Sequence, residues 1–170
     1  DAFRQSFKYY RQDVSAWKAA VERKNQNVEF KKSWQLAFDS NVSPDIEPYQ
    51  VGDKVATRKA WGRFLESYQM QQPFIVGGSA DLEPSNATAG FAKAVGDYSK
   101  ENTLGRNFAY GVREFPMGTI NNGIALHGGM KVFGATFFVF SDYERPALRV
   151  RALMEIPVVS IYTHDSIFVG

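Results

Sequence analysis

One carboxylate and a group of aromatic residues have the clearest chemical potential in this sequence. Glu114 opens an expected helix, and Phe137, Phe140 and Tyr143 follow further along the chain at spacings of three. A carboxyl group that is buried against rings is harder to ionise and can share a proton with a nitrogen of a flat ligand. The alternatives are that Glu114 is a solvated partner of Arg113 or an acid that complements a helix N-terminus, and that the rings belong only to the core.

Polar residues follow each of four expected strands. Ligands bind beyond the carboxyl ends of the strands in parallel sheets, so four such tips could line one edge. Polar residues also follow strands in any α/β protein, and a single tip therefore indicates little. His164 could contact an anion, whereas His127 precedes two glycines and suits a helix cap. The tips are residues 78–81 with Ser85 close by, 113–114, 141–143 and 163–166.

The elements that must position these residues alternate between helices and short apolar strands. Apolar spacings of three and four predict helices, and short apolar runs bounded by glycine or proline predict buried strands. Alternation of this kind predicts an α/β fold of three αβα layers with a mainly parallel central sheet, preceded by N-terminal linker helices. The expected domains are 1–52 and 53–170. The expected helices are one within 1–26 and others over 27–38, 54–70, 116–126 and 143–154, and the expected strands are 73–78, 107–112, 134–140 and 157–162.

Composition narrows the possible classes of function. The chain has 170 residues, 44% of them hydrophobic, which fits one globular domain with a sizeable core. Its formal charge of +2 is too small to predict a nucleic-acid surface. The chain has no cysteine and two histidines, so we expect neither a thiolate nucleophile nor a cysteine- or histidine-rich metal centre. No apolar run reaches the length of a membrane span, so we expect a soluble, cytoplasmic protein, and the chain resembles an excised piece.

Four ordered motifs resemble the transketolase family. The resemblance covers about residues 56–170 and points to the middle, pyrimidine-binding domain of a bacterial-type enzyme, with the earlier helices similar to the segment before that domain. Because the strings are linked and occur in the family's order, the resemblance is specific. The strings are GGSADLEPSN from Gly77, YGVREFPMG from Tyr110, ATFFVFSDY from Ala135 and YTHDSI from Tyr162.

The resemblance implies roles at the cofactor. Glu114 matches the family's glutamate, the catalytic residue that hydrogen-bonds the pyrimidine nitrogen of thiamine diphosphate and thereby activates the cofactor. Phe137, Phe140 and Tyr143 match the rings that enclose the pyrimidine, and Asp81 matches an aspartate near the thiazolium side. The implied fold is the pyrimidine-domain type of thiamine-diphosphate enzymes.

The resemblance also implies substrate contacts and a missing half of the site. Arg58, Ser85 and His164 match contacts to the phosphate end of a sugar phosphate. In the family a separate N-terminal domain binds the diphosphate and a divalent metal such as Mg²⁺, so no metal ligand is expected in this chain. The cofactor lies between two subunits, so the implied partner is a second copy in a homodimer. A Gly-Glu-Asp-Gly-Pro-Thr-His run expected after this point is absent, and Phe168 stands where a smaller residue is expected.

Ketol transfer in the pentose phosphate pathway is the implied activity of the parent enzyme, and the 170 residues alone are expected to be inactive. Three alternatives stay open. A relative such as dihydroxyacetone synthase would use the same half-site with another acceptor. A stand-alone binding or dimerisation module would keep the fold without catalysis, and an unrelated α/β binding domain would lack the four ordered motifs.

Overall fold

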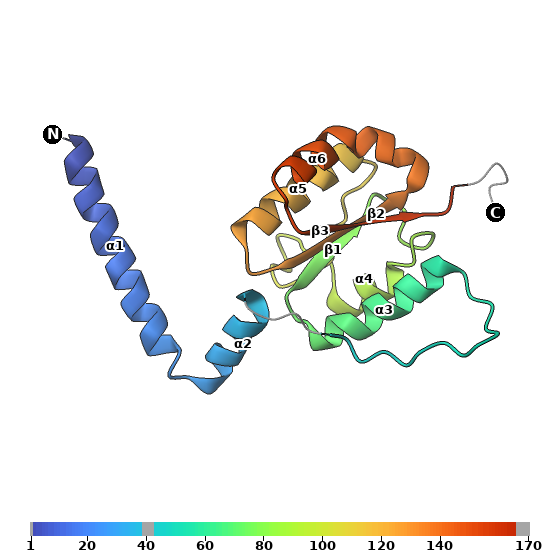
Figure 1. Ribbon diagram of the computed structural model, residues 1–170, viewed down its shortest axis with the longest axis horizontal. Coiled ribbons are helices and arrows are strands. Elements are labelled where there is room, and N and C mark those ends of the chain that lie inside the picture. Colours follow the sequence, from blue (N-terminus) through green and yellow to red (C-terminus); the bar gives the residue numbers. More distant parts are fainter. Residues whose placement is uncertain (1, 39–42, 166–170) are drawn as a thin grey trace. The chain divides into compact units, whose positions relative to one another are not determined.

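The computed structural model describes residues 2–38 and 43–165, which fall into two compact units, Asp1–Ser40 and Asn41–Gly170 (Figure 1). The first unit holds two helices, α1 (Ala2–Lys24) and α2 (Val28–Phe38). Asn27 caps α2, since its Oδ1 accepts a hydrogen bond from the backbone N–H of Phe30 at 3.0 Å. Trp34 of α2 packs against Trp17 of α1 with ring centroids 6.4 Å apart, which joins the two helices, and against Phe38 of its own helix at 4.5 Å.

The second unit is built on a parallel sheet. Its three strands are β1 (Ile75–Ser79), β2 (Lys131–Phe137) and β3 (Val158–Thr163), in the order β1-β2-β3. Helices α5 (Glu114–His127) and α6 (Ser141–Leu153) cover one face, and α3 (Thr57–Gln71) and α4 (Ala89–Val95) cover the other (Figure 1). This is the expected α/β class with three αβα layers, so that prediction is confirmed.

Alternate residues of β2 face the two helical layers. Phe133 points to the α3–α4 layer, where its ring meets those of Trp61 and Phe91 at centroid distances of 5.6 and 5.2 Å. Gly134 points to α5, because a Cβ atom at this position would meet the side-chain nitrogen of Asn121 at 2.6 Å. The two-residue period of a strand therefore assigns Phe137 to the α3–α4 face and Thr136 to the α5–α6 face.

Helices α5 and α6 pack closely near their first turns. A Cβ atom at Gly118 would lie 2.7 Å from Ala147 Cβ and 2.8 Å from Glu144 Cγ. One turn further along α5, Asn122 accepts a hydrogen bond from Arg151, which lies one turn further along α6, so the two helices run in the same direction. Because α6 begins directly after β2 and η1 (Phe138–Phe140), the first turns of both helices lie at the carboxyl edge of the sheet.

Two of the expected strands differ from the structure. Residues 107–112 were expected to form a strand, but only Asn107 forms isolated bridges, to Gly77 and Asp97, and Gly111 has a φ of 66° that ends the extended backbone. The strand expected over 134–140 covers 131–137 instead and turns into η1. Helix α4 was not predicted, because seven residues are too few for a clear helical period.

The remaining helices and strands lie close to their expected ranges. The expected boundary between residues 52 and 53 stays a prediction. Phe168 and the end of the last strand tip lie outside the described residues.

Candidate functional site

The three predicted pocket rings form a continuous row. Phe137 ends β2, Phe140 ends η1, and Tyr143 lies in the first turn of α6. The rings of Phe137 and Phe140 are 5.7 Å apart and inclined by only 19°, and those of Phe140 and Tyr143 are 6.0 Å apart. The spacing of three fits this arrangement, because residues three apart lie on one side of a helical turn. Tyr143 is largely exposed, so the row reaches the surface.

Arg58 and His164 meet across the chain. Arg58, in the first turn of α3, has its Nη1 3.0 Å from Nδ1 and 3.3 Å from Nε2 of His164. The His164 ring also contacts Phe137 edge-on at 4.7 Å, which ties this pair to the aromatic row. A guanidinium only donates, so His164 accepts this hydrogen bond, and its tautomer decides which of the two ring nitrogens does so.

A hollow of about 540 Å³ lies beside this pair. Its lining combines a cation, an imidazole, a hydroxyl and apolar surface, which are groups that suit an anionic, partly polar ligand. The lining residues are Ala56, Thr57, Arg58, Trp61, Ile161, Tyr162, Thr163 and His164.

Asn86 connects the tips of β1 and β3. Its Nδ2 donates to Ser79 Oγ at 2.8 Å, and its Oδ1 accepts from Thr163 Oγ1 at 2.7 Å. Asn86 is fully buried, so both bonds are formed in a desolvated layer. These bonds hold the loop that carries Ser85 against the end of β3, which His164 follows. Sequence reasoning missed this role, because an asparagine in a polar loop is ordinarily a turn residue.

Glu114 is the first residue of α5 and is only 7% exposed. Among the described residues its carboxylate accepts no hydrogen bond and forms no ion pair. Arg113 bonds instead to the carbonyl oxygen of Tyr110 at 3.0 Å. The alternative of a solvated Arg113 partner does not fit this geometry, whereas the helix N-terminal position does.

The structure brings the predicted residues to one edge but not into one cluster. Arg58, His164 and the aromatic row touch one another, while no described hydrogen bond or ring contact joins Glu114 to them. Asp81 follows β1 and is exposed, with a left-handed φ of 63° that aspartate tolerates better than most residues. His127, the last residue of α5, lies on the exposed surface with its Nδ1 3.3 Å from the carbonyl oxygen of Gly128.

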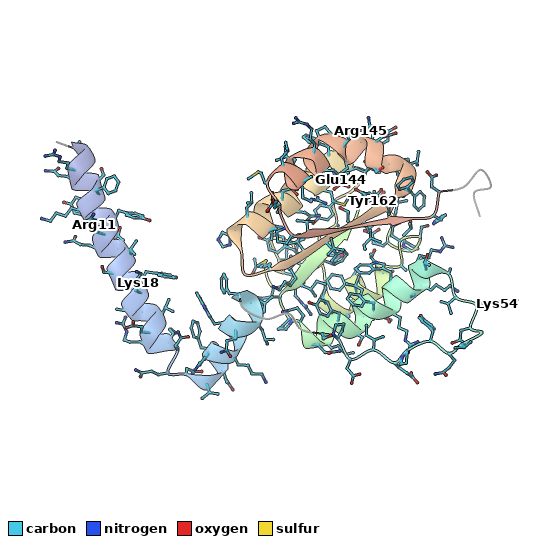
Figure 2. The ribbon with its side chains drawn as sticks, in the orientation of Figure 1. Arg11, Lys18, Lys54, Glu144, Arg145 and Tyr162 are labelled. Carbon is cyan, nitrogen blue, oxygen red and sulfur yellow. The ribbon has the colours of Figure 1, made fainter. Side chains whose placement is uncertain are left out.

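A buried ionic network lies between α6 and the sheet, and sequence reasoning missed it. Glu144 is 1% exposed, and its Oε1 lies 3.1 Å from Arg151 Nη2. Its Oε2 accepts a hydrogen bond from the Tyr162 hydroxyl at 2.8 Å. In Figure 2, Glu144 and Tyr162 lie between α6 and the sheet, whereas Arg145 lies on the outer side of the helix. Arg151 Nε also donates to Asn122 Oδ1 at 2.8 Å, so the guanidinium is held from two helices.

Burial decides the direction of the pKa shifts in this network. It raises the pKa of the Glu144 carboxyl, and the Tyr162 hydrogen bond and the Arg151 charge act in the opposite direction. Burial and the adjacent Glu144 raise the pKa of Tyr162 to about 12, so its hydroxyl keeps its proton and donates. The network is therefore an ion pair with one neutral donor.

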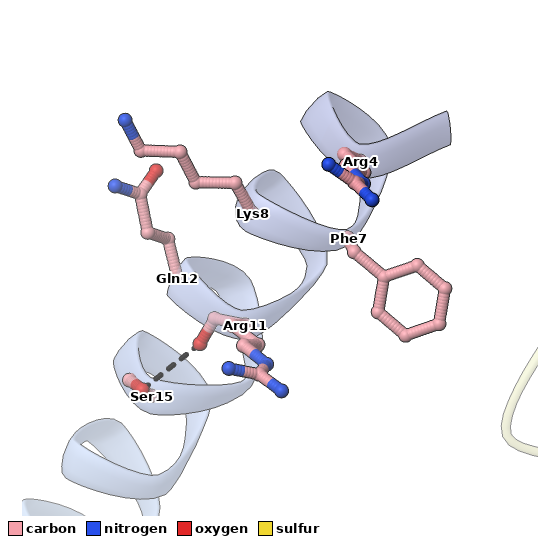
Figure 3. A pocket seen from close by; sticks show the side chains of 6 residues that line it. All are labelled: Arg4, Phe7, Lys8, Arg11, Gln12 and Ser15. Carbon is pink, nitrogen blue, oxygen red and sulfur yellow. Dashed lines mark hydrogen bonds between the residues drawn. The ribbon is translucent and has the colours of Figure 1, made fainter. Parts of the chain in front are cut away.

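Another hollow, of about 610 Å³, carries no comparable chemistry. Figure 3 shows that helix α1 alone supplies its lining, so it has a single wall. In residues 2–38 and 43–165, no three side chains of metal-binding type lie together, and no helix is long and apolar enough to cross a membrane. The lining of the hollow is Arg4, Phe7, Lys8, Arg11, Gln12 and Ser15.

The fold and the site define an α/β domain that presents aromatic rings, a buried carboxylate and a basic pair at the carboxyl edge of a parallel sheet. Residues 53–170 match the family model described as transketolase, pyrimidine binding domain. The chain belongs to this family, and the resemblance carried by the four motifs is confirmed.

Individual relatives agree with this assignment. A transketolase of Halalkalibacterium halodurans is 55% identical over 122 residues, which are 72% of this chain and 18% of that protein. The solved transketolase of Leishmania mexicana has a TM-score of 0.80 at 30% identity and covers 99% of this chain and 26% of its own. A Pichia stipitis transketolase solved with sedoheptulose-7-phosphate has a TM-score of 0.76 at 36% identity, over 96% of this chain and 25% of its own. The chain thus spans less than a third of the length of these relatives.

Proposed function

We propose that this chain is the pyrimidine-binding part of a thiamine-diphosphate-dependent transketolase, which transfers a two-carbon ketol unit from a ketose phosphate to an aldose phosphate. The family assignment of residues 53–170 supports the cofactor. The Pichia stipitis relative, solved with a sugar phosphate, supports the substrate class. The dihydroxyacetone synthase alternative is not favoured, since the relatives described above are transketolases.

The residues at the carboxyl edge fit the pyrimidine end of the cofactor. Phe137 and Phe140 offer nearly parallel faces to a flat ring, and Tyr143 extends the same row. Glu114 is only 7% exposed and offers a carboxylate with no hydrogen bond from any described residue. When bound, thiamine diphosphate would supply the nucleophilic carbon that this chain lacks.

The buried Glu114 carboxylate is the observation that carries this proposal. Because the carboxylate accepts no hydrogen bond from the described residues, a ligand N–H could donate to it without displacing one. Glu114 would hold the proton shared with the pyrimidine nitrogen, and the rings would enclose the pyrimidine. Asp81 would lie on the thiazolium side.

Arg58, Ser85 and His164 would bind the phosphate end of the substrate. Arg58 supplies a charged fork, and the imidazole of His164 supplies a second polar group beside it. Asn86 and Thr163 would keep these groups in register, because their bond links the loop of Ser85 to the tip of β3.

The rest of the site would come from outside this chain. The diphosphate and its divalent metal, such as Mg²⁺, would bind to the diphosphate-binding domain of the other subunit in a homodimer. We expect a cytoplasmic enzyme, and we expect the chain alone not to catalyse ketol transfer.

Replacement of the central carboxylate tests the proposal. In the full-length transketolase that contains this chain, Glu114→Gln should slow proton–deuterium exchange at the thiazolium carbon by about 100-fold or more, the upper part of the range for general acid–base catalysis. Nuclear magnetic resonance after acid quench measures this exchange directly. The exposed Glu101→Gln removes an equal charge and should leave the exchange rate at the parental value. Exchange at the parental rate in Glu114→Gln would contradict the assigned role.

A further inference from the structure

The loop before α5 fixes where that helix begins, and Glu114 is the first residue of the helix. The N-cap residue Arg113 forms no side-chain cap, and its Nη1 instead donates to the carbonyl oxygen of Tyr110 at 3.0 Å. Gly111 between them has a left-handed φ of 66°, and a Cβ atom there would lie 2.5 Å from Arg113 Nη1. The position of Glu114 therefore depends on how the backbone of this loop is held.

Tyr110 joins this loop to the middle of α5. Its hydroxyl donates to Asn121 Oδ1 at 2.5 Å, and Asn121 lies two helical turns beyond Glu114. Asn121 is fully buried and Tyr110 is nearly so, and little water therefore competes for this bond. Burial also raises the pKa of Tyr110, so the hydroxyl keeps its proton and remains the donor. The loop and the helix are thus cross-linked on both sides of Glu114.

The same asparagine fastens the cross-link to the sheet. Asn121 Nδ2 donates to the carbonyl oxygen of Phe133 on β2 at 3.3 Å. A Cβ atom at Gly134 would come within 2.6 Å of that nitrogen, so the missing side chain at Gly134 gives the amide room. Tyr110 in turn packs in one buried cluster with Ala80, the residue after β1. We call Tyr110 and Asn121, bonded to each other and to β2, the α5 clamp.

The Glu114 carboxylate has no anchor of its own. It is only 7% exposed, and it accepts no hydrogen bond from the described residues. Its place is therefore set by the backbone that carries it, and the α5 clamp ties that backbone to β2. Displacement of a reacting group by about 1 Å can cost roughly 100-fold in rate, so a loosened clamp would be felt at the cofactor.

We propose that Tyr110 and Asn121 are positioning residues for the cofactor chemistry, and that their bonds to each other and to β2 set the place of the Glu114 carboxylate at the carboxyl edge of the sheet. Both residues act through Glu114, so neither is assigned a contact with the cofactor. This inference rests on the proposed function of Glu114.

Local amide exchange in the cofactor-free protein tests the clamp itself. In the full-length transketolase that contains this chain, Tyr110→Phe should speed amide hydrogen exchange over residues 111–117 by about 3- to 10-fold, the change expected for one neutral hydrogen bond. Tyr68→Phe is the matched control, since it removes from α3 a hydroxyl that is bonded to the amide side chain of Gln72. This control should leave residues 111–117 at the parental rate. Parental exchange in Tyr110→Phe would contradict the clamp.

Proton exchange at the cofactor tests the positioning role. With saturating thiamine diphosphate and Mg²⁺, Tyr110→Phe should slow proton–deuterium exchange at the thiazolium carbon by about 10-fold, a smaller loss than in Glu114→Gln. The KM for a phosphorylated donor should change little, because Arg58 belongs to α3 and not to the clamp. Tyr68→Phe should leave both quantities at their parental values.

A double variant separates positioning from stability. Tyr110→Phe leaves Asn121 Oδ1 buried without a donor, and the additional Asn121→Leu removes this unpaired acceptor. The thermal midpoint should therefore recover in the double variant, while thiazolium exchange stays slow because the bond to β2 is also lost.

The outcomes distinguish this inference from the proposed function. The inference is wrong if thiazolium exchange recovers together with the thermal midpoint, or if it keeps the parental rate in both the single and the double variant. If Glu114→Gln exchanges at the parental rate, the proposed function fails. If Glu114→Gln is impaired and the clamp variants are not, only this inference fails.

Discussion

At the carboxyl edge of the sheet, the two helical layers present charged groups in opposite ways. On the α3 side, Arg58 and His164 are half-buried and line a hollow. On the α5–α6 side, Glu144 and Arg151 are buried and bonded to each other. A basic pair that lines a hollow can exchange bound water for an anion, whereas a buried ion pair keeps its two charges bonded to each other. This difference leaves the α3 side open to an anionic ligand and makes the α5–α6 side a closed structural ion pair.

The largest expected effect comes from breaking the Glu144–Arg151 ion pair on the α5–α6 side. Arg151→Met leaves Glu144 buried without its cation, and loss of one partner of a buried pair costs about 3–5 kcal/mol. Amide hydrogen exchange in α5 and α6 should therefore speed up strongly in the full-length protein. The double variant with Glu144→Met should recover much of the lost protection, because no uncompensated charge remains. Unchanged protection in the single variant would show that the network is not closed.

The next largest effect comes from removing the charge of Arg58 on the α3 side, a change that should leave the fold intact. Arg58→Gln removes a charged donor, and such a bond contributes about 1.5–3 kcal/mol, or roughly 10- to 160-fold in kcat/KM. We expect that loss for phosphorylated donors and little loss for unphosphorylated ones, as measured by steady-state kinetics. Lys59→Gln, on the exposed side of the same turn, should change neither. Equal losses for both donor types would argue against phosphate binding at Arg58.

A smaller effect comes from comparing two glycines of α5, of which only Gly118 lies against α6. Gly118→Ala would force a Cβ atom to within 2.7 Å of Ala147 and 2.8 Å of Glu144, and overpacking of this kind costs about 1–3 kcal/mol. A Cβ atom at Gly123 would have no such neighbour within 4 Å, so Gly123→Ala should stabilise the helix by about 0.5–1 kcal/mol. Amide exchange in α5 should thus accelerate in one variant and slow in the other. Equal changes would mean that the helices do not meet at Gly118.

The smallest effect is a pH dependence of local stability. The folded state raises the pKa of Glu144 above its ordinary 4.5, so its contribution to stability is fully present below that value. The contribution is lost as the pH rises through the folded-state pKa. Amide exchange compared between the parent and Glu144→Gln at each pH should show the parent losing relative protection over this window. A difference that does not vary with pH would contradict the raised pKa.

The sequence predicted the α/β layers well because alternating apolar strands and helices leave a strong periodic signal. It also singled out Glu114, the aromatic row and His164, which the four motifs contain, whereas Arg58 lies outside the motifs and was assigned only through the family resemblance. The strand expected over 107–112 failed because the left-handed backbone at Gly111 depends on its surroundings, not on apolar pattern.

The buried network could not be predicted from residue types. Glu144 and Arg151 are two turns apart on α6, where acids and bases ordinarily form a solvated helix face. Their burial depends on the parallel approach of α5, which in turn depends on Gly118. Asn86 escaped notice for a similar reason, since its partners Ser79 and Thr163 are distant in the chain.

The missing side chain at Gly118 has an evolutionary consequence. A Cβ atom at 118 would meet both Ala147 Cβ and Glu144, so a larger residue fits at 118 only where both neighbours on α6 give way. We therefore expect relatives to keep glycine at 118 wherever 144 and 147 carry side chains of the present size. A substitution at 118 would then be inherited together with changes on α6, without altering any residue of the aromatic row.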